Sequence, residues 1–256
     1  MKIATWNVNS IRARQERVLA WLAKAQPDAL CIQELKVTDD AFDYDAFQEA
    51  GYYALVHGQK TYNGVAILCQ DLPADMHTGL GDDADDPQAR LIAATIAGVR
   101  IVNAYVPNGQ EVGSDKWAYK LEWLRRLRAY LERTARPSGE LVLCGDLNVA
   151  VDDKDVAHPE EWADTVLCHA DAREALAGVC GWGLVDVFRK HHPDGGVYSW
   201  WDYRALAFPK NNGLRIDHVL ATKKLSAQCT SAEVDRDERK GEKPSDHAPI
   251  VAVFEE

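Results

Sequence analysis

Short apolar runs alternate with amphipathic helical segments along the chain, and this alternation limits the folds that it can adopt. A helix predicted over residues 10–26 separates strands predicted at 2–8 and 29–34, and a helix over 114–135 precedes a strand at 140–145. The other predicted elements are a helix at 171–181 and strands at 52–57, 64–69, 90–97, 99–106, 196–201, 215–222 and 248–254. This mixture of hairpins and helical crossovers favours an α/β sandwich, with two packed mixed sheets flanked by helices, over one doubly wound parallel sheet.

The length and composition are typical of a globular enzyme. The chain has 256 residues, of which 46% are hydrophobic and 27% charged, and no linker, repeat or low-complexity tract divides it. We therefore expect residues 1–256 to form a single domain. No apolar run approaches the roughly 18 residues that span a bilayer, and MKIATWNVNS has no apolar core of a signal peptide. We expect neither a membrane span nor a secretory leader.

The six cysteines show neither CxxC spacing nor a disulfide framework. Three of them, Cys31, Cys69 and Cys144, lie in apolar strand-like runs, where a free thiol packs as a small hydrophobic group. We expect no disulfides and a reducing, cytoplasmic location, because disulfides persist mainly in oxidising compartments.

The net charge of −11 argues against tight non-specific binding to nucleic acid, since affinity for the phosphate backbone comes largely from Lys and Arg. It does not exclude a nuclease, because net charge describes the long-range field and not the charge of one face. Two other catalytic classes are excluded by motif. Neither the GxxxxGK[ST] of P-loop hydrolases nor the GxSxG of Ser-His-Asp hydrolases occurs.

Polar side chains recur where predicted strands end. In LVLCGDLNVA, Asp146 and Asn148 follow an apolar run, and their spacing of two places both side chains on one face of an extended chain. Asp217 lies inside RIDHVL, where a buried acid needs a partner. Comparable positions near strand ends are occupied by Asn7, Asn9, Glu34, Tyr105, Asn108, Asp246 and His247. Polar turns would explain these residues one at a time, whereas a common rim at the strand ends explains them together.

These residue types suit one chemistry. The carboxylates and amides offer hard oxygen ligands, which suit Mg²⁺ or Mn²⁺. A set with one histidine and no cysteine does not suit zinc. His247 paired with Asp217 would be an oriented, charge-stabilised imidazole. The sequence therefore favours metal-assisted hydrolysis of a phosphate ester.

Eight segments resemble motifs of the exonuclease III family of DNA-repair nucleases, within the endonuclease/exonuclease/phosphatase superfamily: WNVNSIRAR, IQELK, QKTYNGVAIL, NAYVPNG, GDLNVA, SWWDYR, GLRIDH and SDHAP. They occur in this order along nearly the whole chain. The resemblance implies a four-layer α/β sandwich and a Mg²⁺-dependent phosphodiesterase, with Mn²⁺ as a substitute. Its substrates would be double-stranded DNA with abasic sites, nicks or 3′-blocked ends, which it would cut 5′ to abasic sites, trim, or degrade from the 3′ end. It would act as a monomer in the cytoplasm, on the nucleoid when bound to DNA.

The resemblance also implies a set of metal ligands. Glu34 would be the principal ligand, with Asn7 and Asp246 nearby. The whole set of candidate ligands is Asn7, Glu34, Asp146, Asn148, Asp246 and His247. The ion would offset charge on the leaving oxygen or activate the attacking water.

The catalytic roles that the resemblance implies fall on five residues. Asp146 would orient or deprotonate the attacking water, or protonate the leaving oxygen. Asn148 and His247 would hydrogen-bond the scissile phosphate and stabilise its transition-state charge. Asp217 would orient His247, and Tyr105 would contact the phosphate.

Two further groups follow from the same resemblance. Trp200, Leu214 and Ile216 would line a small apolar pocket for a flipped abasic sugar; plain core packing is the less favoured interpretation of Trp200. The candidate DNA contacts are Asn9, Lys60, Arg90, Asn108, Lys116 and Arg204.

The chain departs from the family at one loop. Mammalian members carry an arginine after the tyrosine that wedges into the duplex, whereas residues 106–115 contain no Lys or Arg, and Gln110 is the nearest long polar side chain. The later segment DTVLCHAD offers His169 instead of a basic or bulky apolar wedge. We therefore expect work at 3′ ends to exceed incision at internal abasic sites.

Two other functions are open to this fold. One is a phosphatase or phosphodiesterase acting on lipid or inositol phosphates, against which SWWDYR and GLRIDH argue. The other is a non-catalytic regulator, which would lack the catalytic set. The discriminating residues, all present here, are Glu34, Asp146, Asn148, Asp217 and His247.

Overall fold

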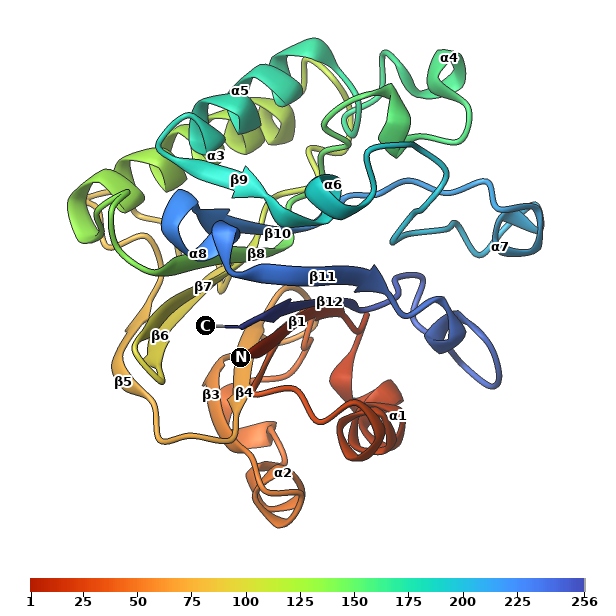
Figure 1. The fold of residues 1–256 in the computed structure, drawn as a ribbon. Coiled ribbons are helices and arrows are strands. Elements are labelled where there is room, and N and C mark those ends of the chain that lie inside the picture. The colour runs from red at the N-terminus through yellow and green to blue at the C-terminus, as the bar shows by residue number, and fades with distance from the viewer. Residues whose placement is uncertain (256) are drawn as a thin grey trace.

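Two six-stranded sheets lie face to face between two layers of helices in the computed structural model, which describes residues 1–255 (Figure 1). The first sheet has the spatial order β11 (Cys229–Val234), β12 (Ile250–Phe254), β1 (Lys2–Asn7), β2 (Ala29–Gln33), β4 (Val65–Cys69) and β3 (Tyr53–His57). The second has the order β5 (Ala74–Thr78), β6 (Leu91–Ile96), β7 (Val99–Tyr105), β8 (Leu141–Asp146), β10 (Asp217–Thr222) and β9 (Leu184–Asp186). The predicted α/β sandwich of two mixed sheets is confirmed.

Helices cover the outer face of each sheet. The helices are α1 (Ile11–Ala25), α2 (Tyr44–Glu49), α3 (Asp115–Thr134), α4 (Pro159–Trp162), α5 (Ala170–Cys180), α6 (Val187–His191), α7 (Ala207–Lys210) and α8 (Lys223–Ala227). The buried faces of α1 and α2 pack on the first sheet, and those of α3 and α5 on the second (Figure 1). These two helical layers complete the four-layer arrangement. No helix within residues 1–255 combines the length and the apolar composition needed to cross a bilayer.

Each sheet has one parallel strand pair near its centre. Strands β1 and β2 are parallel and joined through α1, and β7 and β8 are parallel and joined through α3. Parallel strands deliver their carboxyl ends to the same edge of a sheet. In the second sheet the register places Tyr105 beside Asp146 across the parallel pair, and Asp217 of β10 opposite Asp146. The strand ends that carry polar residues are therefore brought together by topology.

The space between the two sheets is filled by small and branched apolar side chains. Cys31, Cys69 and Cys144 lie in this layer among Ile, Val and Ala residues, as predicted for free thiols packing as hydrophobic groups. All six cysteines are free.

Helix α3 supports the second sheet and begins at a side-chain cap. The Ser114 hydroxyl accepts a hydrogen bond from the Trp117 backbone N–H at 3.2 Å, which satisfies a donor of the first turn. At α1, by contrast, Ser10 is in the N-cap position but its side chain caps nothing. The 90–97 and 99–106 hairpin turns at Ala97 and Gly98, which both have positive φ (47° and 84°), as a two-residue turn of this kind requires.

One predicted strand is wrong. Residues 196–201 form only isolated bridges, from Trp200 to Leu214 and to His247. The apolar side chains that suggested a strand pack in different directions: Tyr198 and Trp201 belong to a small separate cluster, whereas Trp200 packs on the core of the second sheet and Val197 on the layer between the sheets. Eight of the helices and strands were not predicted: α2, α4, α6, α7, α8, β5, β9 and β11. All are short, and the three strands lie at sheet edges, where one-sided contacts leave a weak hydrophobic pattern.

Candidate active site

Four polar side chains meet where the parallel strand pairs end, and they come from both sheets. Asn7 ends β1 and Glu34 follows β2, whereas Tyr105 and Asp146 end β7 and β8. The Asn7 amide donates to Glu34 Oε1 and to Asp146 Oδ2, each at 2.9 Å. The Tyr105 hydroxyl donates to Glu34 Oε1 at 2.9 Å. Hydrogen bonds therefore run from one sheet to the other through the polar strand ends.

The two central strands finish with the same local turn. The Asn148 backbone N–H donates to Asp146 Oδ1, and the Asn9 backbone N–H donates to Asn7 Oδ1, each at 3.0 Å. Asn9 and Asn148 have φ of 46° and 51°, a left-handed conformation that asparagine tolerates. Gly145 precedes Asp146 because β7 passes so closely that a Cβ there would lie 1.9 Å from the Ala104 carbonyl oxygen. The polar turn is thus real, and it aims these side chains.

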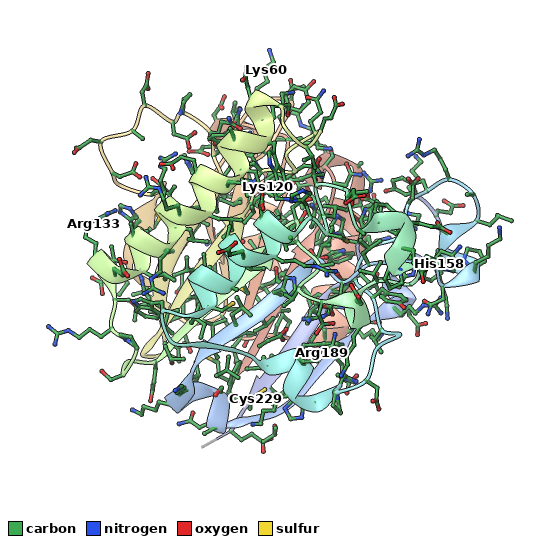
Figure 2. All side chains as sticks on the ribbon, turned by 90° about the horizontal axis from the view of Figure 1, so that it is seen from above. Lys60, Lys120, Arg133, His158, Arg189 and Cys229 are labelled. Atoms are coloured by element: carbon green, nitrogen blue, oxygen red, sulfur yellow. The ribbon has the colours of Figure 1, made fainter. Side chains whose placement is uncertain are left out.

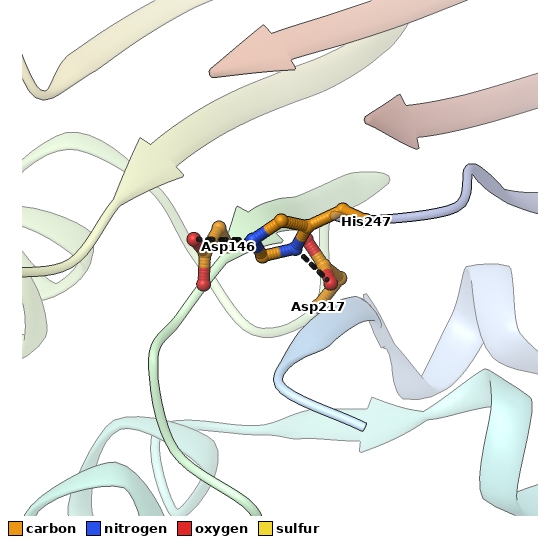
Figure 3. A group of neighbouring side chains, drawn as sticks. All are labelled: Asp146, Asp217 and His247. Atoms are coloured by element: carbon orange, nitrogen blue, oxygen red, sulfur yellow. Dashed lines mark hydrogen bonds and ion pairs between the residues drawn. The ribbon is translucent and has the colours of Figure 1, made fainter. Parts of the chain in front are cut away.

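His247 lies between two carboxylates (Figure 3). Its Nδ1 is 2.8 Å from Asp217 Oδ2, and its Nε2 is 3.8 Å from Asp146 Oδ2. The exposed fractions of Asp146, Asp217 and His247 are 2%, 0% and 4%. Burial opposes charge on the ring, but Asp217 and Asp146 outweigh it and raise the pKa of His247 to about 10. His247 is therefore an imidazolium at neutral pH, a hydrogen-bond donor and not a base.

The pKa of Asp146 is also raised, but here the raised pKa favours the neutral form of the side chain. Burial is the main cause that raises its pKa to about 7, with the neighbouring Asp217 and Glu34 charges adding to it and His247 opposing. A carboxylic acid with a pKa near neutrality can exchange protons at neutral pH. Of the two side chains facing each other, Asp146 is therefore the one suited to accept or donate a proton.

A second chain of contacts runs from Glu34 along the first sheet. Lys36 Nζ lies 2.8 Å from Glu34 Oε2 and donates to Asn9 Oδ1 at 2.6 Å. The Asn9 amide donates to Asp246 Oδ1, and the Trp200 indole N–H to Asp246 Oδ2, each at 3.0 Å. Burial favours the neutral form of Glu34, but Lys36 and the Asn7 amide outweigh it and hold its pKa below the ordinary value. The pKa of Asp246 is likewise lowered against burial, by His247 and by its hydrogen bonds.

The oxygen-rich donor set fits a hard divalent cation. Four carboxylates gather here with two cationic side chains, His247 and Lys36. Added positive charge would therefore offset the carboxylate repulsion that adds to the effect of burial on the pKa of Asp146. Asp146, Asp217 and His247 place one ligand atom each within 4.8 Å of one another and could hold a metal ion. Because Asp217 is committed to His247, Glu34, Asp146 and Asp246 are the more open oxygen donors.

Three of the six predicted DNA contacts line a cavity beside Tyr105. Arg90, Asn108 and Lys116 line this cavity of about 550 Å³ together with Gln110. The Asn108 amide donates to Asn148 Oδ1 at 3.1 Å, which links the cavity wall to the catalytic residues. Lys60 is exposed and lies at the periphery of the molecule (Figure 2).

Arg204, a predicted DNA contact, is paired with a carboxylate, and His169, in the segment that departs from the family, has a structural role. Arg204 forms a two-pronged pair with Asp202, at 2.9 and 2.7 Å, so its charge is partly neutralised. His169 accepts a hydrogen bond from the Asp171 backbone N–H at 3.2 Å and packs edge-on against Trp117. It thus caps α5.

The predicted sugar pocket has closed walls. Leu214 and Ile216 are 1% and 2% exposed, and the half-buried Trp200 indole is met edge-on by Trp162 of α4, with ring centroids 5.8 Å apart. The Trp200 indole N–H donates to Asp246, which places Trp200 beside the polar side chains at the strand ends. The apolar surface of Leu214 and Ile216, however, is covered.

Two residues of the site were missed from the sequence. Lys36 stands in the IQELK motif, but no role was assigned to it. Lys120 is fully buried, and its Nζ donates to the carbonyl oxygens of Asn108, Asn148 and Val166 at 3.1, 2.7 and 2.5 Å. It points from α3 into the molecule (Figure 2). Its position on the apolar stripe of α3, three residues after Trp117, was the signal that could have found it.

Comparisons with known proteins agree with this geometry. The model of the endonuclease/exonuclease/phosphatase family matches residues 4–247. Exodeoxyribonuclease III of Haemophilus influenzae is 36% identical over 266 residues, covering 99% of this chain and all of that protein. An AP endonuclease from Archaeoglobus fulgidus is 44% identical with a TM-score of 0.97, and both chains are fully covered. A variant of the 3′ phosphatase NExo from Neisseria, bound to a product DNA hairpin, is 42% identical with a TM-score of 0.96 and full coverage of both chains. The chain belongs to the endonuclease/exonuclease/phosphatase family and, within it, to the exonuclease III group.

Proposed function

We propose that this chain is a Mg²⁺-dependent DNA-repair phosphodiesterase of the exonuclease III type. Its activities would be 3′-to-5′ exonuclease on duplex DNA, removal of 3′ phosphates and other 3′ blocks, and incision 5′ to abasic sites. The observation that carries the proposal is the connected group at the strand ends, in which a buried imidazolium, His247, faces Asp146 beside the Glu34 carboxylate. The similarity to an exodeoxyribonuclease, an AP endonuclease and a 3′ phosphatase supports the same activities.

The proposed metal ligands are Glu34, Asp146 and Asp246, with Asn7 beside them. The other candidates, Asn148 and His247, would bind the phosphate instead. When bound, Mg²⁺ would stabilise charge on the phosphate oxygens and lower the pKa of a water molecule. Mn²⁺ has the same preference for oxygen ligands and is expected to substitute.

The side chains themselves would bind the phosphate and move one proton. The His247 imidazolium and the Asn148 amide would donate hydrogen bonds to the scissile phosphate, where negative charge accumulates. Asp217 would hold His247 charged and oriented. The Tyr105 hydroxyl stays protonated, since burial and Glu34 raise its pKa well above the ordinary value, so it would also donate. Asp146 would accept the proton of the attacking water.

The cavity beside Tyr105 is the proposed path of the DNA strand. Arg90 and Lys116 on its wall would contact phosphates, Asn9 and Asn108 would contact the DNA near the cleaved bond, and Lys60 would extend the same surface. Arg204 would take part only by leaving Asp202.

We further propose that work at 3′ ends exceeds incision at internal abasic sites. An internal abasic sugar must leave the duplex and enter an apolar pocket, and Leu214 and Ile216 offer little open surface for it. The loop 106–115 also supplies no cation to replace the flipped nucleotide. A free 3′ end needs no such displacement.

The remaining parts of the proposal concern the form in which the protein acts. We propose a monomeric single domain over residues 1–256, supported by the apolar layer that the two sheets share. We place it in the cytoplasm of a bacterial cell, on the nucleoid when bound to DNA, because its substrate is there.

The test uses three duplexes that differ only in the lesion: an internal abasic site, a nick with a 3′ phosphate, and a recessed 3′ end. Purified protein is incubated with each in Mg²⁺, in Mn²⁺ and in EDTA. We expect the 3′ phosphate to be removed fastest, the abasic site to be cut slowest, and EDTA to abolish all three. No cleavage of any duplex would instead support a non-catalytic regulator, and hydrolysis of inositol phosphates alone would support the phosphatase alternative.

A further inference from the structure

We infer that a buried cluster of three polar side chains, Thr5, Gln33 and Asn103, aligns the two sheets so that their halves of the active site meet. We call this cluster the amide clamp. The inference rests on the proposed function, because it concerns how that function's residues are positioned. All three side chains are 0% exposed and lie between the sheets, away from any place that DNA could reach. They are positioning residues, not catalytic ones.

The clamp joins backbone and side chains across the inter-sheet space. The Asn103 amide of β7 donates to the carbonyl oxygens of Ile32 and Ala66, at 2.9 and 2.8 Å. These two carbonyls belong to β2 and β4 of the other sheet. In return, the Gln33 amide of β2 donates to Asn103 Oδ1 at 2.7 Å and to Thr5 Oγ1 at 2.9 Å. Asn103 thus bonds to three groups of the opposite sheet.

The clamp lies directly behind the catalytic residues in both sheets. Gln33 immediately precedes Glu34 and pairs with Asn7 in the parallel ladder. Asn103 lies two residues before Tyr105 on β7, so both side chains point to the same face of the strand. A shift of one sheet against the other at the clamp would therefore move Glu34 relative to Tyr105 and Asp146 by a similar amount.

Apolar packing alone does not set this alignment sharply. The buried apolar cluster around the clamp consists of Ile, Val, Ala, Leu, Phe and Cys side chains, and hydrophobic attraction is non-directional. Hydrogen bonds weaken steeply away from their preferred distance and angle. Catalysis is sensitive at the same scale, since a displacement of about 1 Å can cost about 10²-fold in rate.

The other bonds between the sheets cannot replace the clamp. Asn7 to Asp146 and Tyr105 to Glu34 also join the two sheets, but these groups would reorganise when metal and phosphate bind. Gln33 Oε1 is buried without a hydrogen-bond partner among residues 1–255. An unpaired buried polar atom lowers stability. We therefore attribute the role of Gln33 to the alignment of the two sheets and not to the free energy of folding.

The decisive variant replaces both amides with apolar side chains of similar size, Gln33→Met with Asn103→Leu. Replacing both amides leaves neither of them unpaired, but the Ile32 and Ala66 carbonyls and the Thr5 hydroxyl lose their amide donors. We expect the double variant to fold, with Tm lowered by no more than about 8 °C. We expect kcat for 3′-phosphate removal to fall about 10-fold or more, with KM changed less than about threefold, because the DNA-contacting surface is retained.

A matched control tests whether any buried polar change has this effect. Thr222→Val removes a fully buried hydroxyl at the far end of β10, where Thr222 Oγ1 donates to the Gly139 carbonyl at 2.8 Å. Its kcat should stay within about twofold of the unaltered protein, whatever its Tm. The single variant Gln33→Met loses the bond to Asn103 Oδ1 but retains the two bonds from the Asn103 amide to the Ile32 and Ala66 carbonyls. It should therefore fold even if the double variant does not. Its kcat should fall about threefold or more.

Calorimetric titration of DNA-free protein with Mn²⁺ separates this inference from the proposed function. Ligands from both sheets must converge on the ion, so the double variant should bind Mn²⁺ more weakly than the Thr222→Val control. If the unaltered protein cleaved no DNA, the proposed function would fail, and this comparison would still decide the inference. Folded Gln33→Met and double variants with kcat and Mn²⁺ affinity both within twofold of the unaltered protein would overturn it.

Discussion

Asp217 Oδ2 lies 2.8 Å from His247 Nδ1, and both side chains are buried at the point where β10 meets the segment before β12. We predict that Asp217→Asn lowers kcat by about 10²-fold or more, because an amide cannot hold the ring charged. The pKa of His247, followed by NMR titration, should fall in the same variant. An unchanged His247 titration would show that Asp217 does not control the charge of the ring.

Asp146→Asn and His247→Ala test the proposed proton acceptor and the proposed hydrogen-bond donor to the phosphate. Each should lower the rate of 3′-phosphate removal by at least about 10²-fold while the fold survives, since one change removes the proton acceptor and the other a charged donor. Circular dichroism checks the fold and single-turnover kinetics the rate. Near-normal turnover in either variant would mean that its assigned role is wrong.

Glu34→Gln tests the metal site. The amide keeps the size of the side chain but removes a charged oxygen ligand, so the Mg²⁺ concentration for half-maximal activity should rise about 10-fold or more. Metal titrations of activity measure this shift, and Mn²⁺ titrations by calorimetry measure binding directly. The matched control is Glu161→Gln on the exposed surface of α4, which should leave both midpoints in place.

The pH dependence of stability follows from the raised pKa of His247, about 10 in the folded protein against about 6.5 in an unfolded chain. The folded state then binds the proton more tightly, so this contribution to the free energy of unfolding is complete below about pH 6.5 and is lost as the pH rises towards 10. The pKa of Asp146 is raised to about 7, so this residue changes the free energy of unfolding mainly between about pH 4 and 7. It contributes little to the change in stability above pH 7.

Urea unfolding of the unaltered protein and of His247→Gln measures this contribution. Between pH 7 and 10 the stability difference between the two proteins should shift steadily in favour of His247→Gln. A difference that stays constant over this range would contradict the raised pKa.

Lys120→Met should loosen the three loops that Lys120 holds. Its ammonium donates to backbone carbonyls at Asn108, Asn148 and Val166, and these bonds are lost while the methylene packing is largely kept. We expect the free energy of unfolding to fall by about 2–4 kcal/mol and amide exchange to accelerate in those loops. Lys116→Met, at an exposed position on the same helix, should change stability by less than about 0.5 kcal/mol.

Much of the site could be recognised from local sequence because its residues occupy strand ends. The spacing of Asp146 and Asn148 predicted side chains that project together, and an acid inside RIDHVL predicted a partner for Asp217. The polar turns that were the alternative explanation are present in the structure, and the Asn9 and Asn148 turns orient the candidate site residues before them. The predicted strand at 196–201 is wrong because its apolar residues pack into three different clusters and form only isolated bridges.

The sequence by itself determined the fold class, the central strands with their polar ends, and the family, because these depend on residue types at short spacings. Only the tertiary structure decided which residues face each other. The approach of Glu34 to Tyr105, the insertion of Lys36 and Lys120, and the covering of Leu214 and Ile216 all depend on two sheets meeting in one register. A contact such as that of Glu34 with Tyr105, 71 positions apart in the chain, leaves no periodic pattern along it, and so it is settled by packing.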